Sequence, residues 1–434
     1  MISRLLAPLL FLGLAAGRLP AQDHRHLRDR IPELFSFGSC GQPLCLDGSV
    51  SAANGHGDHF LPGVASANAS IIGFLTDAIA VNASNLPLSA SSSGQTFRFE
   101  GGLPVKTSGS LGPIFAERAQ TLGRGRLVVG ANLSGVELTS LRGVPMDKLV
   151  LNFTHADVPG VGRPGLGDPE KENDIIQVRL QMYVNLLVST FFATYGVSDR
   201  LDLSVAVPLV HTSLQGRSQA QIFPFGPTAV HFFTGTALDP GLSASAATFG
   251  SATGIGDIAL RAKGSLRSAE RFRVAVMADA RLPTGSEADL TGSGHLALRG
   301  LAILSGRFGD VSPHLNLGYL LRGGSGRTDA FLVTAGFDHP LSGWTTLAAD
   351  VLSEWQTGAG GLQLPGTVTL LYPFVRTVEP TNIPEMKDHR VVGSFGFKFR
   401  TPGGPLVVTN ALVPLRRGGL QSSLVWTVGL DLSL

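Results

Sequence analysis

The chain has 434 residues, of which 55 are glycine and only 15% are charged, and its mean hydropathy is +0.22. Its net charge of +2 gives no case for nucleic acid as a partner, and outside the first stretch no window contains the roughly 18 uninterrupted apolar residues of a transmembrane helix. A chain this apolar can hide its apolar surface by closing into a transmembrane β-barrel; a large soluble all-β protein is the alternative.

Residues 1–21 have the pattern of a secretory signal peptide. Arg4 precedes an apolar run over residues 5–16, and the small residue Ala21 stands directly before Gln22. The run is too short for a spanning helix of about 20 residues. We therefore expect an exported mature chain.

Residues 22–126 differ from the rest of the chain in being rich in Gly, Ser, Asn and Pro, without a sustained alternation. Partial helical spacing predicts a short helix within residues 70–86, and residues 96–106 are predicted to form a small hairpin. We interpret the region as an N-terminal periplasmic or lumen-filling plug. The alternatives are a flexible periplasmic tail and a hairpin that adds two strands to the barrel wall.

The only two cysteines, Cys40 and Cys45, stand in a short loop with Gly and Pro, which predicts a disulfide between them in an exported chain. Their spacing lacks the Cys-x-x-Cys redox pattern, and two thiolates alone make a poor zinc site. His56, Asp58 and His59 are close enough in sequence to bind a metal, but they stand in a Gly-rich polar stretch. No metal and no cofactor is predicted.

From residue 127 to residue 434 the pattern has a period of two, which is typical of strands with one apolar and one polar face. Residues 176–192 show it most clearly, with apolar residues at the even positions from 176 to 188 and polar residues at the odd positions from 177 to 185. The pattern predicts an all-β, antiparallel, up-and-down transmembrane barrel of about twelve strands, with fourteen as the upper bound. The predicted strands are 127–139, 175–195, 201–211, 255–266, 271–283, 294–308, 311–322, 328–340, 344–356, 390–401, 404–414 and 421–434.

The links between these strands alternate between short and long. Long links are predicted at 140–174, 212–254 and 357–389, with shorter ones at 284–293, 323–327 and 415–420. Between these six links fall tight turns near 198, 268, 309, 342 and 402. Bacterial outer-membrane barrels have short periplasmic turns and longer extracellular loops, so the alternation predicts a bacterial outer-membrane location. Aromatic residues near predicted strand ends suit interfacial girdles, although they are equally consistent with core packing: Phe191, Phe192, Tyr195, Tyr319, Trp344, Trp355 and Trp426.

Three short motifs resemble a known family. They are YGVSDRLDLSVAVP at residues 195–208, GIGDIAL at 254–260 and LPTG at 282–285, and the stretch GPIFAERAQTLGRG at 112–125 is similar to the lead-in to the first strand of plugged barrels. The motifs resemble outer-membrane channels of the phenol meta-pathway family (MetA-pathway of phenol degradation), which is itself similar to the long-chain fatty-acid transporters. The resemblance implies a channel for hydrophobic or aromatic small molecules, with an N-terminal hatch in the fatty-acid branch. About twelve strands here against fourteen in that branch argue against carrying over its lateral opening.

The C-terminal strand, residues 426–434, has apolar residues at alternate positions and ends the chain. It resembles the terminal signal by which assembly machinery recognises outer-membrane barrels, although a Leu stands where a Phe is usual. Membrane lipid and the outer-membrane assembly machinery are therefore expected partners.

Polar positions of the alternation predict which side chains line the lumen. Cations outnumber anions among them, so one hypothesis is a mild anion preference or capture of carboxylate-bearing solutes; the other is that Arg and Asp pair across neighbouring strands to fill a polar interior. The predicted lumen residues are Gln177, Arg179, Gln181, Tyr183, Asn185, Asp202, Arg261, Lys263, Arg273, Asp279, Arg281, Arg299, His314, Asn316, Asp350, Lys398 and Arg400.

The predicted loop 212–254 is unusually aromatic, which predicts an outer vestibule that adsorbs hydrophobic solutes; the alternative is that its phenylalanines pack the loop onto the barrel rim. They are Phe223, Phe225, Phe232, Phe233 and Phe249.

The favoured function is an outer-membrane channel for passive uptake of small, hydrophobic or aromatic solutes. The alternatives are a structural or adhesive barrel and, less favoured, an outer-membrane hydrolase. A hydrolase needs Ser and His partners at the lipid-facing rim, and His211 with Ser213 shows no such arrangement. We therefore expect a protein that is not an enzyme.

Overall fold

A computed structural model of the protein describes residues 25–37, 43–46, 60, 73, 75, 78–79, 97–100, 103–106, 110–154, 174–226, 229, 231–269, 271–324, 327–358, 364, 366–371 and 374–434. The predicted signal peptide, Cys40 and the residues 56–59 lie outside this part of the chain. None of the helices in it is long and apolar enough to cross a membrane.

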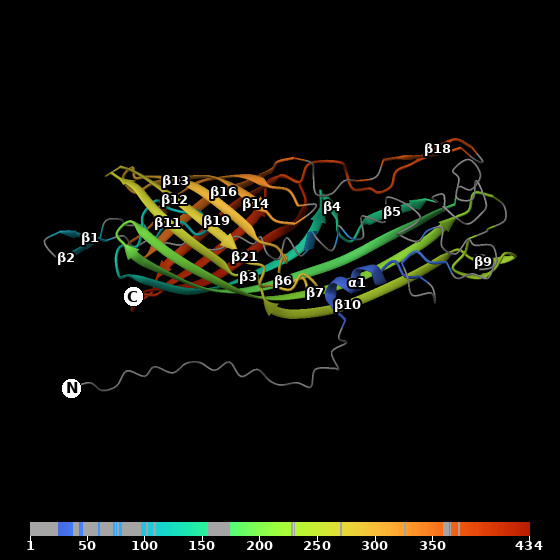
Figure 1. Ribbon diagram of the computed structural model, residues 1–434, viewed down its shortest axis with the longest axis horizontal. Helices are drawn as coiled ribbons and strands as arrows, with labels where there is room; N and C mark the ends of the chain where they lie inside the picture. Colours follow the sequence, from blue (N-terminus) through green and yellow to red (C-terminus); the bar gives the residue numbers. More distant parts are fainter. Residues whose placement is uncertain are drawn as a thin grey trace, which may run out of the picture.

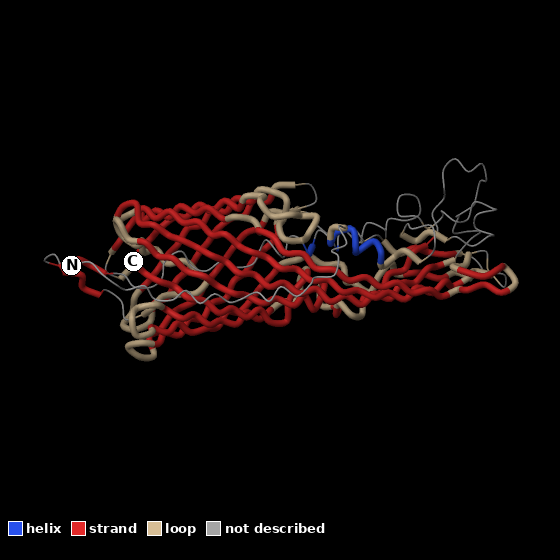
Figure 2. Tube along the Cα trace, turned by 90° about the horizontal axis from the view of Figure 1, so that it is seen from below, coloured by secondary structure: helices blue, strands red, loops and turns tan. Residues whose placement is uncertain are grey.

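Within the described residues, twelve antiparallel strands close into one barrel (Figures 1 and 2). Each strand pairs with the next along the chain, apart from small inserted strands, and the last strand pairs with the first through contacts such as Leu430 with Ala131. The prediction of about twelve strands is confirmed. The strands are β3 (Leu127–Leu141), β6 (Ile175–Ser198), β7 (Leu201–Phe223), β11 (Ala259–Ser268), β12 (Phe272–Arg281), β13 (Ala297–Gly306), β14 (Ser312–Arg322), β15 (Ala330–Pro340), β16 (Thr345–Gln356), β19 (Arg390–Arg400), β20 (Leu406–Pro414) and β21 (Leu420–Ser433).

The two ends of the barrel differ. At one end lie the short turns, and there Leu127 and Leu434 join the first and last strands through backbone hydrogen bonds of 2.7 and 3.2 Å. At the other end β6 and β7, with 24 and 23 residues, continue far beyond their neighbours. Because short turns are periplasmic in such barrels, the long end is extracellular.

Beyond the barrel, the long strands form what we call the extension sheet, in the order β5 (Leu149–Thr154), β6, β7 and β10 (Ser243–Ile255). β10 takes the place of β11 beside β7, because β7 pairs with β11 up to Ala206 and with β10 from Leu209 onward. The predicted loop 212–254 is therefore wrong: only its middle is a loop, and the rest is strand. Small strands accompany the sheet: β4 (Val144–Pro145), β8 (Thr234–Thr236), β9 (Asp239–Gly241), β17 (Val368–Leu370) and β18 (Arg376–Val378).

The hydropathy pattern of β6 inverts along its length. In the barrel, Phe191 and Tyr195 are exposed on the outer face, while Thr190 and Thr194 are buried on the inner face. In the extension sheet the even positions from Ile176 to Leu186 are apolar and buried, and the odd positions from Gln177 to Asn185 are polar and outward. One strand thus serves two environments, lipid outside the barrel and water outside the extension.

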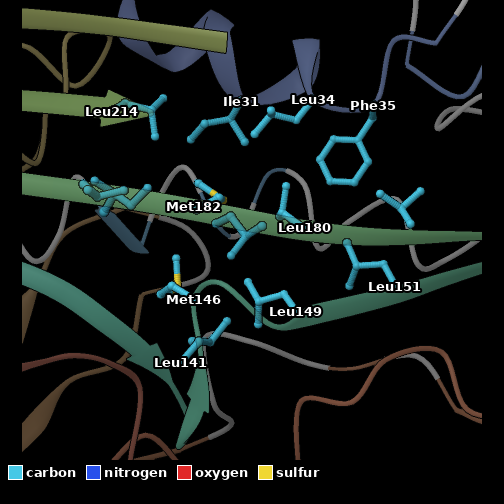
Figure 3. Packing of buried hydrophobic residues seen from close by; sticks show 14 of the residues in the cluster. Ile31, Leu34, Phe35, Leu141, Met146, Leu149, Leu151, Leu180, Met182 and Leu214 are labelled. Carbon is cyan, nitrogen blue, oxygen red and sulfur yellow. The ribbon is translucent and has the colours of Figure 1, made fainter. Parts of the chain in front are cut away.

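The buried face of the extension sheet packs against the N-terminal part of the chain. Helix α1 (Leu27–Glu33) lies on β10, and Ser218 Oγ of β7 donates to the Leu34 carbonyl at 2.5 Å. Ile31, Leu34 and Phe35 enter a common apolar cluster with Leu180 and Met182 of β6 (Figure 3). Residues 25–37 therefore lie on the extension sheet rather than within the closed barrel, and the plug interpretation of residues 22–126 stays a prediction.

The remaining described parts of the N-terminal region are small. β1 (Phe97–Glu100) and β2 (Leu103–Lys106) form the predicted hairpin, as a separate two-stranded sheet rather than as part of the wall. Residues 73, 75, 78 and 79 are helical, within the predicted short helix. Cys45 is disulfide-bonded, and Cys40 is the only other cysteine of the sequence.

A glycine of β6 is required by a close backbone approach. A Cβ on Gly196 would collide with the Gly123 carbonyl, where the chain enters β3, whereas a Cβ on Gly300 of β13 would meet nothing within 4 Å.

We expect Gly196→Ala to lower the free energy of unfolding by about 2 kcal/mol. Gly300→Ala is the matched control and should leave stability unchanged or slightly higher. Urea unfolding followed by the heat-dependent shift in gel mobility measures both; equal midpoints would contradict the prediction.

Candidate functional site

The outer wall of the barrel is apolar. Alternate residues of each barrel strand point outward, and among these Leu203, Leu298 and Phe395 are each more than 40% exposed. Tyr319 and Trp355 lie toward the extracellular ends of their strands and Trp344 beside a periplasmic turn, as expected for girdles, whereas Trp426 lies mid-strand opposite Gly135. An apolar belt around a closed barrel has only lipid to face, so the protein is a bacterial outer-membrane barrel.

The inner wall is charged and internally paired. Asp279 of β12 accepts from Arg261 Nε at 2.8 Å and from Arg299 Nη2 at 2.7 Å. Further along the same wall, Arg322 Nη2 of β14 donates to Glu354 Oε1 of β16 at 2.6 Å. Charges taken out of water are costly unless paired, and here neighbouring strands supply the partners.

Residues 110–122, which we call the crossing segment, run inside the barrel from β15 and β16 to β7. Ser110 and Arg118 bind the buried Asp338 of β15, and Arg118 Nε lies 3.0 Å from its Oδ1. At the far side, the Leu122 amide donates to Asp202 of β7 at 3.0 and 3.1 Å. The segment is therefore attached to opposite walls of the lumen.

The middle of the crossing segment is also bound to the wall. The Glu117 amide donates to Asn316 Oδ1 at 2.8 Å, and Asn316 Nδ2 donates back to the Glu117 carbonyl at 2.9 Å. The Glu117 carboxylate lies 3.4 Å from Lys263 Nζ and 3.7 Å from Arg261 Nη1. These buried contacts give the segment a fixed position across the lumen.

A cavity of about 150 Å³ lies against the crossing segment, toward the extracellular side. Its lining combines apolar side chains with four arginines and three carboxylates. Among the described residues, none accepts a hydrogen bond from the buried Arg299 Nε–H. The principal lining residues are Phe115, Glu117, Arg261, Asp279, Arg281, Arg299, Leu301, Leu320, Leu332, Leu352, Glu354, Arg390, Val392 and Leu412.

Two of the sequence motifs meet at the mouth of the barrel. Asp257 of GIGDIAL accepts from the Gly285 amide of LPTG at 3.1 Å, and from the amide and hydroxyl of Ser293 at 2.8 and 2.6 Å. Thr284 Oγ1 accepts from the Ile258 amide at 3.0 Å and donates to the Gly256 carbonyl at 2.7 Å. The motifs therefore fold the loop between β12 and β13 onto the end of β10.

The same loop holds the N-terminal segment. The Arg28 amide donates to the Ala288 carbonyl at 2.9 Å, and His26 Nδ1 lies 2.9 Å from Asp289 Oδ1. This hydrogen bond and the charge of Asp289 raise the pKa of His26 above its ordinary value. A histidine whose pKa is higher in the folded state than in the unfolded state stabilises the folded state. This stabilisation is fully present below the unfolded-state pKa and is lost as the pH rises through the folded-state pKa.

The structure divides the predicted lumen residues into two groups. The group on β6 was assigned to the wrong face: these side chains point outward from the extension sheet, because the apolar face of β6 packs against α1 there. They are Gln177, Arg179, Gln181, Tyr183 and Asn185. The others lie on the inner face of the barrel: Asp202, Arg261, Lys263, Arg273, Asp279, Arg281, Arg299, His314, Asn316, Asp350, Lys398 and Arg400.

Several site residues were not among those predicted. Glu117 and Arg118 belong to a motif that was interpreted only as a lead-in, and Asp338, Glu354 and Arg390 occupy inner positions of their strands. The period-two pattern contained the signal for the last three, because each has the same parity as inward neighbours on its strand.

The predicted vestibule phenylalanines do not come together. Phe232 and Phe233 are fully buried in the packing of the extension, whereas Phe249 is 80% exposed on the outer face of β10. Phe223 ends β7 on the outer face, and the Phe225 amide donates to Asp174. The packing interpretation holds for Phe232 and Phe233, and the five do not form one surface.

The comparisons with known proteins agree with the motifs. Residues 165–369 match the sequence model of the family described as "Putative MetA-pathway of phenol degradation". The resemblance to this family is confirmed. The matched range contains all three quoted motifs, whereas the crossing segment and the C-terminal strand lie outside it. No curated protein is significantly similar to the chain.

Several solved structures of outer-membrane proteins are similar to this chain at low sequence identity. An outer membrane channel from Pseudomonas putida F1 has 12% identity and a TM-score of 0.39, over 73% of this chain and 98% of that chain. The P. putida toluene transporter TodX has 10% identity and a TM-score of 0.31, over 71% and 89%. A FadL homologue from Pseudomonas aeruginosa has 11% identity and a TM-score of 0.29, over 71% and 88%.

Removing Arg118 should loosen the crossing segment. In Arg118→Ala the buried Asp338 and Ser110 lose their cationic partner, and breaking a buried pair from one side typically costs 3–5 kcal/mol. We expect amide hydrogen exchange in residues 110–122 to accelerate by about 100-fold while the barrel strands stay protected. Arg124→Ala, an exposed arginine next to the segment, is the control. Unchanged exchange in Arg118→Ala would show that the ion pair does not hold the segment.

Proposed function

We propose that the protein is a passive outer-membrane channel for small hydrophobic or aromatic solutes, which it binds in the cavity above the crossing segment. The observation that carries the proposal is the composition of this cavity, whose lining includes Phe115, five leucines and Val392 among its charged residues. Side chains that only paired charges across the lumen would not require this apolar surface. A volume of about 150 Å³ is that of a cavity that holds one benzene ring.

The charged residues that line the cavity favour solutes that also bear a carboxylate. Arg261, Arg281, Arg299 and Arg390 face Glu117, Asp279 and Glu354, which leaves one positive charge in excess (four minus three). An incoming carboxylate would accept from the unpartnered Arg299 Nε–H while its ring lies against the leucines. Mild anion preference follows from the same excess.

The crossing segment supports the proposal that the N-terminal region closes the channel. It spans the lumen with its side chains buried, so solute that reaches the cavity from outside meets it before the periplasm. Release into the periplasm then requires displacement of this segment. Recognition of the C-terminal strand by the assembly machinery is part of the same proposal.

Filling the cavity should abolish solute binding. Leu352 lines the cavity from β16, and Leu352→Trp places an indole in the space for the solute. We expect at least a tenfold loss in naphthalene binding, measured by its fluorescence, and in benzoate influx into proteoliposomes. Leu317→Trp adds the same side chain on the lipid-facing wall and should change neither. Full binding and influx in Leu352→Trp would refute the cavity as the solute site.

Single-channel conductance tests the closure. In planar bilayers the full mature chain should be nearly closed, whereas a chain that lacks residues 22–121 should conduct and, in a salt gradient, give a reversal potential of anion preference. If the truncated chain folds but does not conduct, wall side chains fill the lumen and the channel proposal fails. Cation preference would remove the carboxylate component alone.

A further inference from the structure

The outward face of the extension sheet rises directly from the lipid-facing wall. On β6 the outer apolar positions end at Leu187, and the next outward residue is Asn185; on β7 they end at Leu209, followed by His211. Leu187 pairs with His211, so both strands leave the apolar belt at the same height. From His211 to Arg217 the strand climbs about 20 Å, at about 3.4 Å per residue. This face therefore stands beside the head groups of the outer leaflet.

The composition of this face is unusual for a water-exposed surface. Above the belt, the outward positions of β6, β7 and β10 that the structure describes carry amides, hydroxyls and two arginines but no carboxylate. Neither Arg179 nor Arg217 forms an ion pair with the described residues; Arg179 Nε contacts only Gln177 Oε1, at 3.4 Å. The nearest carboxylates are Glu137 of β3, which pairs with Asn185 at the base, and Asp147.

The side chains form rows across the sheet. One row places Gln215 between Tyr183 and Phe249, which are 46% and 80% exposed. The next row up pairs Gln181 with Arg217, and the row above it pairs Arg179 with Gln219. The two aromatic rings offer surfaces for stacking, and the amides can hydrogen-bond to hydroxyl groups. The guanidinium groups can bind phosphate through two hydrogen bonds each.

The upper rows are also hollowed. A trough of about 720 Å³ is lined by Arg179, Arg217 and Lys148, with Asp147 as its one carboxylate. A second hollow of about 470 Å³ lies above it, lined by Gln177, Gln221 and their neighbours. The trough thus carries two positive charges in excess (three minus one).

We propose that this face binds the phosphorylated core sugars of an outer-leaflet glycolipid, which stand above its lipid anchor. Arg179, Arg217 and Lys148 bind phosphate, the amides bind sugar hydroxyls, and Tyr183 and Phe249 stack on sugar rings. A second copy of the chain is a poor occupant, because a two-fold contact through this face would bring two cation-rich troughs together with only one carboxylate, Asp147, in each. The inference does not depend on the solute that the lumen carries.

The test compares three full-length proteins in detergent. Arg179→Ala with Arg217→Ala removes the charge of the trough, and Arg267→Ala with Arg271→Ala removes two exposed arginines at the periplasmic turn as the control. The probes are rough lipopolysaccharide with a phosphorylated inner core, the same lipopolysaccharide after dephosphorylation of its core, and lipid A alone. Gel mobility and conductance verify that each barrel is folded.

The wild type and the control should bind the phosphorylated probe most tightly, and more weakly as salt is raised. At about 1 kcal/mol for each arginine near an anionic surface, the trough variant should bind about 30-fold more weakly. Equal affinity of the trough variant and the wild type would overturn the proposal, as would tightest binding to lipid A alone. Protein-concentration-dependent dimers that the trough substitutions dissolve would assign the face to a second copy instead.

Discussion

The pairing of β21 with β3 is the interaction on which the rest of the structure depends. In hydrocarbon every backbone N–H and C=O must find a partner within the protein, and a sheet satisfies this only when it has no open edge. Once the ring is closed, the alternation of side chains sends successive residues to lipid and to the lumen. The apolar belt and the charged interior are two consequences of this one closure.

A charged interior in turn needs partners that the wall alone does not supply. Asp338, Lys263 and Asp202 all point inward, and each is bound by the crossing segment through Arg118, the Glu117 carboxylate or the Leu122 amide. The segment and the wall therefore stabilise each other. The cavity lies above this segment, where charged residues and leucines of the wall line it together.

The barrel could be predicted from the sequence because period-two alternation and link length are local signals, and they located the barrel strands to within a few residues, except for the upper half of β7, residues 212–223, which was predicted as loop. The extension could not. β10 consists mainly of small and polar residues, and little alternation of apolar and polar residues indicates a strand there. The role of Asp257 was equally hidden, because its partners Gly285 and Ser293 are 28 and 36 residues away in sequence. In the lumen, the odd or even position of a residue on its strand identified the inward residues of the barrel strands. It could not identify their partners in the crossing segment.

The five misassigned residues of β6 show why alternation alone does not decide which face is inside. A strand that alternates apolar and polar residues buries its apolar face in water but exposes it in lipid, so the same pattern has opposite meanings on the two sides of the membrane boundary. In β6 the inner face changes from Thr190 to Val188, and in β7 the outer face changes from Leu209 to His211. Val188 pairs with Val210, beside Leu209, so both inversions lie at one height. The point where the phase inverts is therefore itself a sequence signal for the membrane surface, and above it these two strands bury apolar side chains on the face that, below it, lines the lumen.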